Sequence, residues 1–184
     1  MKTILPKAGR PPERMEIPVK VLVIGGVAAG TKTAAKLKRE DPSAEVTILN
    51  MGEDISYAGC GLPYYVGGVI ADRGELIVNT PAQFEKLTGV AVKCGVEAVA
   101  LDRSARTVTA RNLSDGSETV YGYDKLVLAV GASPVAPPIP GVDLENVFFL
   151  RTPEDAAALR RAAESGQVRR AVVVGGGYIG LEAA

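Results

Sequence analysis

The side chain best suited to chemistry in this sequence is the thiol of Cys60. It lies in the run Ser56 to Tyr65 (SYAGCGLPYY), with a glycine on each side and Pro63 shortly after it. Proline is favoured in the first turn of a helix, so we expect a short helix just after Cys60, and unpaired N–H groups at its amino end would stabilise a thiolate. The pattern predicts a redox-active cysteine. The alternative is a small buried side chain that only packs.

The elements that would position Cys60 are a strand, a glycine turn, a helix and a second strand. Val19 to Ile24 is an aliphatic run typical of a buried parallel strand, and Glu45 to Leu49 is expected to be the next strand. Between them, Gly25 to Gly30 leads into a helix over Thr31 to Glu40. This βαβ order is typical of dinucleotide binding, where a pyrophosphate approaches backbone N–H groups at a helix amino end. Because Val27 replaces the middle glycine of G-x-G-x-x-G, a turn with a purely structural role remains the alternative.

The end of the second strand departs from the usual dinucleotide pattern. Such folds commonly place an acidic residue there to hold ribose hydroxyls, whereas this sequence has Asn50. Asparagine can still accept a hydrogen bond, and Glu53 is a nearby carboxylate. The affinity for a nucleotide is therefore open at this stage.

The middle of the sequence predicts a helix from Pro81 to Leu87, preceded by a Thr80 cap. Short strands follow, and we expect the first three to form a small antiparallel meander: Ala91 to Leu101, Arg106 to Leu113, Glu118 to Tyr121, and a buried run over Lys125 to Val130. The proline-rich stretch Ala136 to Gly141 is then expected to be an extended connector between domains.

A second glycine turn follows the connector. The sequence predicts a helix capped at Thr152 and running to about Glu164, then a strand over Ala171 to Val174. Gly175 to Gly180 matches G-x-G-x-x-G in full and leads into a helix that stops at Ala184. So short a helix is unstable alone, so we expect a fragment that ends inside a second nucleotide-binding unit.

Composition excludes some classes of function. Lys plus Arg equals Asp plus Glu, at 21 each, so no large field would attract nucleic acid or an anionic membrane. There are two cysteines, and we find no long apolar run, secretory signal or metal-ligand pattern. We expect a cytoplasmic protein without nucleic-acid or membrane partners. Residues 1–18, which are rich in proline and charge, are expected to be a flexible leader.

Two dinucleotide turns with a cysteine after the second strand resemble the flavin- and pyridine-nucleotide-dependent disulfide reductases. The stretch around Cys60 is similar to the single-cysteine branch, because Tyr65 stands where the other branch has a second cysteine. That branch includes coenzyme A disulfide and persulfide reductases, NADH oxidase and NADH peroxidase. The oxidase and peroxidase members have a histidine in the first turn, whereas this sequence has Ala28 there and no histidine at all. The resemblance is therefore greatest to coenzyme A disulfide and persulfide reductases.

The resemblance implies an α/β protein with a Rossmann-like FAD-binding domain over residues 19–150 and the start of an NAD(P)-binding domain over 151–184. Electrons would pass from NADH or NADPH through FAD to Cys60, which would reduce a coenzyme A disulfide, persulfide or polysulfide. The full-length protein would be a homodimer, and this chain alone would be inactive. An NADH oxidase or peroxidase, or a nucleotide-binding fragment without turnover, are the alternatives.

The resemblance also assigns site residues, grouped by ligand. FAD would be held by Gly25, Val27, Ala28, Ala29, Gly30, Asn50, Ala129, Val130 and Gly131. The nicotinamide nucleotide would be held by Gly175, Gly177 and Gly180. The sulfur substrate would meet Lys32, Lys36, Arg39 and Ser56.

The basic residues also stand out without the resemblance. At helical spacing, Lys32, Lys36 and Arg39 fall within roughly 60° of one another and form a stripe suited to phosphate groups. A solvated helix face is the alternative. Lys38 points elsewhere and is expected to be solvated, and Cys94, in a strand without a motif, is expected only to pack.

Overall fold

The computed structural model describes residues 18–184, so the predicted leader lies outside the described residues except for Pro18. A parallel sheet forms the centre, with strand order β3-β2-β1-β7. These strands are β1 (Lys20–Ile24), β2 (Glu45–Leu49), β3 (Ala91–Lys93) and β7 (Lys125–Leu128). β1 lies between β2 and β7, and its Val23 pairs with Ile48 on one side and with Val127 on the other. The carboxyl ends of these strands therefore meet at one edge of the sheet.

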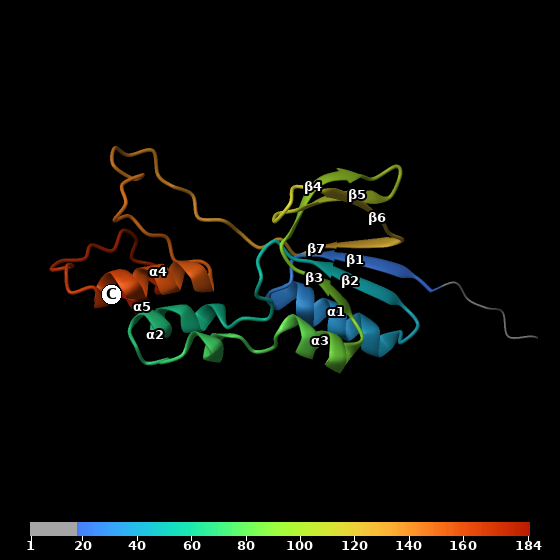
Figure 1. Ribbon diagram of the computed structural model, residues 1–184, viewed down its shortest axis with the longest axis horizontal. Coiled ribbons are helices and arrows are strands. Elements are labelled where there is room, and N and C mark those ends of the chain that lie inside the picture. Colours follow the sequence, from blue (N-terminus) through green and yellow to red (C-terminus); the bar gives the residue numbers. More distant parts are fainter. Residues whose placement is uncertain (1–17) are drawn as a thin grey trace, which may run out of the picture.

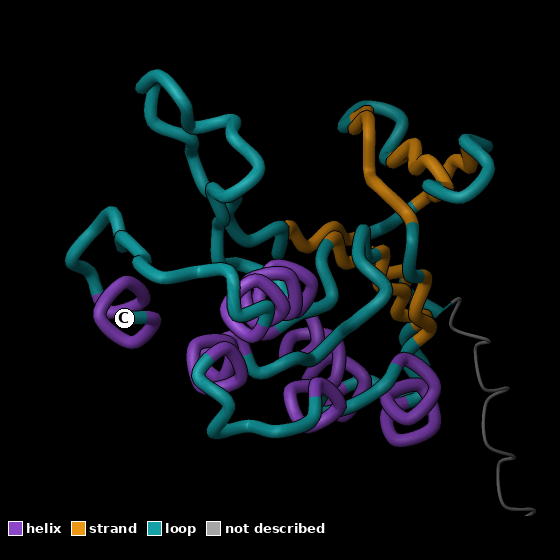
Figure 2. The backbone as a smooth tube through the Cα atoms, turned by 60° about the vertical axis from the view of Figure 1, so that its left-hand side comes forward, coloured by secondary structure: helices purple, strands orange, loops and turns teal. Residues whose placement is uncertain are grey.

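Helices cover one face of the parallel sheet (Figure 1). They are α1 (Ala28–Glu40) and α3 (Pro81–Thr88). The core on this side contains Val23, Ala34 and Ile48, all with no exposed surface, together with Phe84 from α3. In Figure 2 the helices lie to one side of the strands.

A three-stranded antiparallel sheet covers the other face (Figure 1). It is formed by β4 (Val96–Asp102), β5 (Thr107–Asn112) and β6 (Glu118–Gly122). Val108 and Ala110 of β5 pack against Leu22, Ile24 and Leu49 of the parallel sheet. The expected α/β fold with a small meander is confirmed, and it has three layers: helices, parallel sheet and antiparallel sheet.

The segment Ala91 to Leu101 is two strands rather than the single one predicted. β3 adds to the edge of the parallel sheet beside β2, and β4 starts the meander. Cys94 and Gly95 separate them, and Gly95 has a φ of +65°, in the left-handed region that glycine tolerates. The sequence does not reveal this change of sheet, because both halves are equally apolar.

The segment bearing Cys60 lies beyond β2. It comprises a 3₁₀ turn, η1 (Gly59–Gly61), the helix α2 (Leu62–Val66) and a second 3₁₀ turn, η2 (Arg73–Leu76). Ala58 N–H donates to the Leu76 carbonyl at 2.7 Å, and Tyr57 pairs with Ile77 in an antiparallel bridge. These contacts fold residues 57–77 into a closed loop with α2 at its far end.

The last part of the chain contains α4 (Pro153–Glu164) and α5 (Tyr178–Ala183). The cap expected at Thr152 is confirmed, and the structure shows that it is a capping box with Asp155. The strand predicted over Ala171 to Val174 does not form: Val172 is 86% and Val174 85% exposed, and no neighbouring strand pairs with them within residues 18–184. A strand needs such a neighbour to satisfy its backbone groups. Across residues 18–184, no helix is both long and apolar enough to span a membrane.

Candidate functional site

The first glycine turn has no room for a side chain at Gly25 or at Gly30. Gly25 has a φ of +103°, and a Cβ there would lie 2.2 Å from the Ala129 carbonyl oxygen. A Cβ on Gly30 would lie 1.8 Å from the Gly25 oxygen. Ala129 N–H donates to the Ile24 carbonyl at 2.8 Å, which brings the predicted segment Ala129 to Gly131 beside the turn. The two segments expected to hold FAD therefore lie together at the carboxyl ends of β1 and β7.

The turn fits the pyrophosphate that the sequence predicts for it. Val27 precedes the 13-residue helix α1, Ala28 and Ala29 begin it, and all three are half-buried or exposed. The first N–H groups of a helix have no intrahelical partners, and the helix dipole favours an anion beside them. None of these residues is shown to bind a nucleotide, and their roles stay predictions.

Asn50 is buried and joins the first glycine turn to the loop that follows β2. Its side-chain oxygen accepts a hydrogen bond from Gly26 N–H at 2.9 Å. Its Nδ2 donates to the carbonyls of Gly52, at 2.7 Å, and Asp54, at 3.0 Å. Every polar group of this amide thus contacts the protein backbone. The contact with the ribose stays a prediction, and the structure adds a second role, which is to hold the glycine turn.

Ser56 continues this connection toward Cys60. Its N–H donates to the Gly26 carbonyl at 3.0 Å, and its own carbonyl accepts from Val78 N–H at 3.0 Å. Ser56 has a φ of +51°, which is uncommon for a residue with a side chain. The preceding Ile55 is completely buried. The loop that leads to the cysteine is therefore fixed directly to the first glycine turn.

Cys60 is exposed, and it lies in η1 immediately before α2. Pro63 is in the first turn of that helix, as the sequence predicts. Leu62 and Pro63 are buried, so the residues just after the cysteine anchor this segment to the protein. The chain thus presents a free thiol to solvent on an anchored turn.

The basic stripe on α1 is exposed along its length, at Lys32, Lys36 and Arg39. Lys36 forms an ion pair with Glu40. Lys38, expected to be solvated, is instead half-buried: its Nζ donates to the carbonyls of Pro42, at 2.8 Å, and Ala44, at 2.7 Å. That prediction was wrong because the chain turns back over Lys38 at the end of α1. Whether the stripe contacts a substrate stays a prediction.

The second glycine turn repeats the geometry of the first. Gly175 has a φ of +116°, and a Cβ on Gly180 would lie 2.0 Å from the Gly175 oxygen and 3.3 Å from Val173. In the first turn, a Cβ on Gly30 would likewise lie 3.3 Å from Val23. Gly177 precedes α5 as Val27 precedes α1. The close approach of the last glycine of the turn to the oxygen of the first is therefore built twice in the chain.

Charged residues around the Cys60 loop were missed by the sequence analysis. Arg73 forms ion pairs with Asp54 and with Glu154 of α4. Arg151 Nε donates to the Ala132 carbonyl at 2.9 Å. Burial raises the pKa of Tyr57, which lies in the same region. No motif marks these residues, since their partners are distant in sequence.

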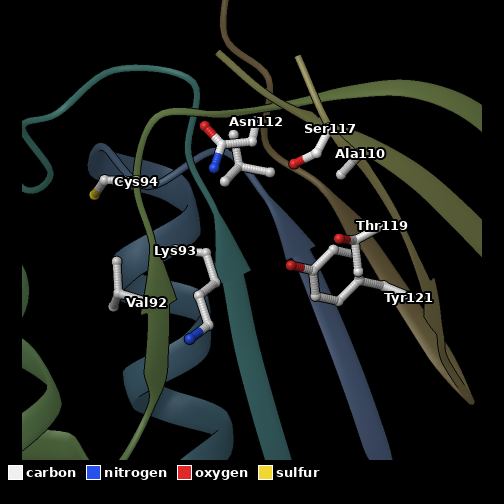
Figure 3. Close-up of a pocket in the computed structure, with 9 residues that line it drawn as sticks. Val92, Lys93, Cys94, Ala110, Asn112, Ser117, Thr119 and Tyr121 are labelled. Carbon is white, nitrogen blue, oxygen red and sulfur yellow. The ribbon is translucent and has the colours of Figure 1, made fainter. Parts of the chain in front are cut away.

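Cys94 differs from Cys60 in its surroundings. It borders a cavity of about 360 Å³ between the two sheets, and in Figure 3 its sulfur points away from Thr119 and Tyr121. Burial, with a smaller effect of the nearby Glu53 carboxylate, raises the pKa of the Cys94 thiol. The described residues contain no cluster of three or more His, Cys, Asp or Glu side chains that could hold a metal.

Comparison with known families agrees with this geometry. The family model described as pyridine nucleotide-disulphide oxidoreductase matches residues 19–184. The chain therefore belongs to this family, and the resemblance inferred from the sequence is confirmed.

Two curated relatives illustrate the range within the family. The chain is 38% identical over 164 residues to an NADH oxidase of Enterococcus faecalis, covering 89% of this chain and 36% of the relative. It is 36% identical over 163 residues to a coenzyme A disulfide reductase of Staphylococcus haemolyticus, again covering 89% of this chain and 36% of the relative. The chain thus spans about a third of the length of these relatives.

Solved structures have the same fold. A reduced Bacillus anthracis CoADR-RHD matches with a TM-score of 0.88 and 36% identity, covering 91% of this chain and 30% of that one. An NAD-dependent persulfide reductase from A. fulgidus matches with a TM-score of 0.85 and 40% identity, covering 89% and 31%.

Proposed function

We propose that this chain is the flavin-binding part of a reductase that passes electrons from NADH or NADPH through FAD to Cys60. The substrate is a coenzyme A disulfide, persulfide or polysulfide. The observation that carries the proposal is the hydrogen bond from Ser56 N–H to the Gly26 carbonyl, because it fixes the cysteine loop to the nucleotide turn. The relatives named as coenzyme A disulfide and persulfide reductases support the substrate class.

Different segments of the chain bind the two nucleotides and the substrate. Backbone groups of Gly25 to Gly30 and of Ala129 to Gly131 hold FAD, and Gly175 to Gly180 hold the nicotinamide nucleotide. FAD, when bound, accepts two electrons as hydride from the nicotinamide and delivers them to sulfur. Exposed cations of α1 and the Ser56 side chain contact the substrate.

Cys60 carries out the sulfur chemistry. Its thiolate attacks one sulfur of the substrate disulfide, which forms a mixed disulfide and releases the other sulfur as a thiolate. Two electrons and one proton then break the mixed disulfide, releasing the second thiol and restoring the Cys60 thiolate. The exposure of Cys60 suits this exchange, because the attacking sulfur must meet the substrate in line.

The test is NADH-driven thiol release under anaerobic conditions by the full-length protein that contains this chain, with FAD and coenzyme A disulfide supplied, because the chain alone is expected to be inactive. We expect two thiols per NADH oxidised in the wild type and in Cys94→Ser, and none in Cys60→Ser. Equal activity in the Cys60→Ser variant would contradict the proposal.

An NADH oxidase is the second candidate, because one of the relatives has that name and is 38% identical. An oxidase consumes oxygen with NADH and needs no added disulfide. We expect little oxygen consumption, since the sequence contains no histidine to assist peroxide chemistry. A third candidate is a nucleotide-binding fragment without turnover, which would bind FAD and release no thiol.

A further inference from the structure

Helix α4 packs directly on the segment that bears the proposed redox cysteine. Ala156 of α4 has no exposed surface and shares a small core with Leu62 of α2 and Leu76 of η2. Tyr65 and Ile70 pack against the same cluster. One face of α4 therefore supports α2, although β3 to β7 lie between the two helices in the sequence.

Arg160 lies one helical turn after Ala156 and binds the far end of α2. Its Nη1 donates to three carbonyls, those of Tyr65 at 3.2 Å, Ile70 at 3.0 Å and Ala71 at 3.1 Å. The guanidinium also stacks on the Tyr65 ring, with its central carbon 4.7 Å from the ring centroid. Glu164 accepts from Nε at 2.8 Å and orients the group. The Arg160 side chain is only 19% exposed.

These contacts join the last turn of α2, through the Tyr65 carbonyl, to the segment that follows it, through the carbonyls of Ile70 and Ala71. The last carbonyls of a helix have no intrahelical partners, and a cation is favoured beside them. An arginine can donate several hydrogen bonds and stack on an aromatic ring at the same time, which a lysine cannot do. Arg160 therefore holds α2 and the following turn in one arrangement.

The position of Cys60 depends on α2 because its own turn makes few contacts. A Cβ on Gly59 would meet no atom within 4 Å in the described part of the protein. On the other side of the cysteine, a Cβ on Gly61 would lie 3.0 Å from Leu76 and 3.2 Å from Ile70. The thiol is thus held from the α2 side, on the face that Arg160 and Ala156 support.

We propose that Arg160 is a positioning residue that, through its contacts with Tyr65, Ile70 and Ala71, fixes α2 and thereby the orientation of Cys60. The inference rests on the proposed function of Cys60 for its catalytic meaning. The contact itself stands on the geometry alone. Tyr65 is the aromatic partner of Arg160 in this contact. It stands at the sequence position where a two-cysteine active site would have its second cysteine.

Hydrogen exchange tests the contact without any cofactor. We expect Arg160→Ala to raise exchange of the amides in residues 59–71 at least about threefold, while amides of β1 and β2 keep their wild-type rates. Arg161→Ala is the matched control, since Arg161 is the exposed neighbour on the same helix. Tyr65→Leu should act like Arg160→Ala, and Tyr65→Phe, which keeps the ring, should behave as wild type.

A spectroscopic measurement tests the positioning of the thiol. With FAD added, a Cys60 thiolate beside the flavin gives a long-wavelength band, and we expect this band to fall at least about twofold per bound flavin in Arg160→Ala and Arg160→Lys. It should be unchanged in Arg161→Ala and Tyr65→Phe.

The inference would be overturned if Arg160→Lys and Tyr65→Leu both showed wild-type hydrogen exchange and an undiminished long-wavelength band. If wild-type protein with bound flavin shows no band, the proposed function fails instead. The exchange data then still decide the role of Arg160. If Arg160→Ala fails to fold, the comparison of Tyr65→Leu with Tyr65→Phe and the Arg160→Lys variant still test the inference.

Discussion

The side-chain oxygen of Asn50 accepts a hydrogen bond from the backbone N–H of Gly26 at 2.9 Å. The Gly26 carbonyl in turn accepts from Ser56 N–H at 3.0 Å. Gly26 therefore connects three segments: the end of β2, the first glycine turn and the loop that leads to Cys60. A shift of the turn is therefore transmitted to the cysteine loop.

Removing the Asn50 amide should destabilise the protein. Asn50→Ala loses three hydrogen bonds and leaves the buried Gly26 N–H unpaired, at a cost of about 2–4 kcal/mol. Asn112→Ala is the control, because the Asn112 side chain, at the end of β5, accepts hydrogen bonds from Ser114 alone among the described residues and joins no distant segments. Urea unfolding followed by circular dichroism measures both. An unchanged midpoint in Asn50→Ala would show that the amide does not hold the turn.

The glycine at the start of α1 should tolerate no side chain. In Gly30→Ala the new Cβ would lie 1.8 Å from the Gly25 oxygen, so the strand and helix must move apart. We expect the free energy of unfolding to fall by about 3 kcal/mol or more. The fall for Gly180→Ala should be as large only if the second glycine turn is packed as tightly as the first. Gly122→Ala, with no atom within 4 Å of its Cβ among the described residues, should cost less than about 1 kcal/mol. Thermal unfolding of Gly30→Ala at the wild-type temperature would contradict this.

The two cysteines should react in a fixed order. Cys60 is exposed, whereas burial raises the pKa of Cys94 and keeps its thiol protonated at neutral pH. Iodoacetamide at pH 7.5 should label Cys60 first, as mass spectrometry of the peptides can show. Predominant labelling of Cys94 in the folded protein would contradict the assignment of Cys60 as the reactive thiol.

The same raised pKa has a consequence for stability at alkaline pH. A thiol whose pKa is higher in the folded than in the unfolded state stabilises the fold below the unfolded-state pKa. This contribution is lost as the pH rises through the folded-state pKa. Wild-type protein should therefore lose more stability than Cys94→Ala between neutral and alkaline pH. Parallel pH profiles of the two proteins would contradict the effect.

The basic stripe on α1 offers a test of substrate class. Lys32→Ala and Arg39→Ala remove exposed cations, so the KM for a phosphate-bearing disulfide should rise several-fold, about tenfold if both contacts are made. The KM for a small uncharged disulfide should stay the same. Lys86→Ala, an exposed cation on α3, is the control. Equal effects on both substrates would assign the stripe to a solvated helix face.

Local signals were sufficient to predict most of the fold. β2 begins and ends at the predicted residues, Glu45 and Leu49, and the caps at Thr80 and Thr152 mark the starts of α3 and α4. The prediction failed where pairing with distant strands decides the outcome. Ala91 to Leu101 divides between two sheets, and Ala171 to Val174 has no strand beside it.

The site was predictable where a motif is local. The glycine turns and the Cys60 run lie within short stretches of sequence, and the structure brings Ala129 to the first turn as expected. The sequence did not predict that Asn50 holds the backbone of the first glycine turn or that Arg160 supports α2. Both roles depend on contacts between residues far apart in sequence, and no local pattern indicates either role.

The most direct test of the central claim is the visible absorption spectrum of the protein with added FAD, before and after dithionite, in the wild type and in Cys60→Ser. We expect bound flavin in both proteins, and in the wild type a long-wavelength band from the Cys60 thiolate to the oxidised flavin, which disappears when dithionite reduces the flavin and which the variant lacks. Bound flavin with no such band, or a band that persists in Cys60→Ser, would contradict the claim that Cys60 exchanges electrons with the flavin.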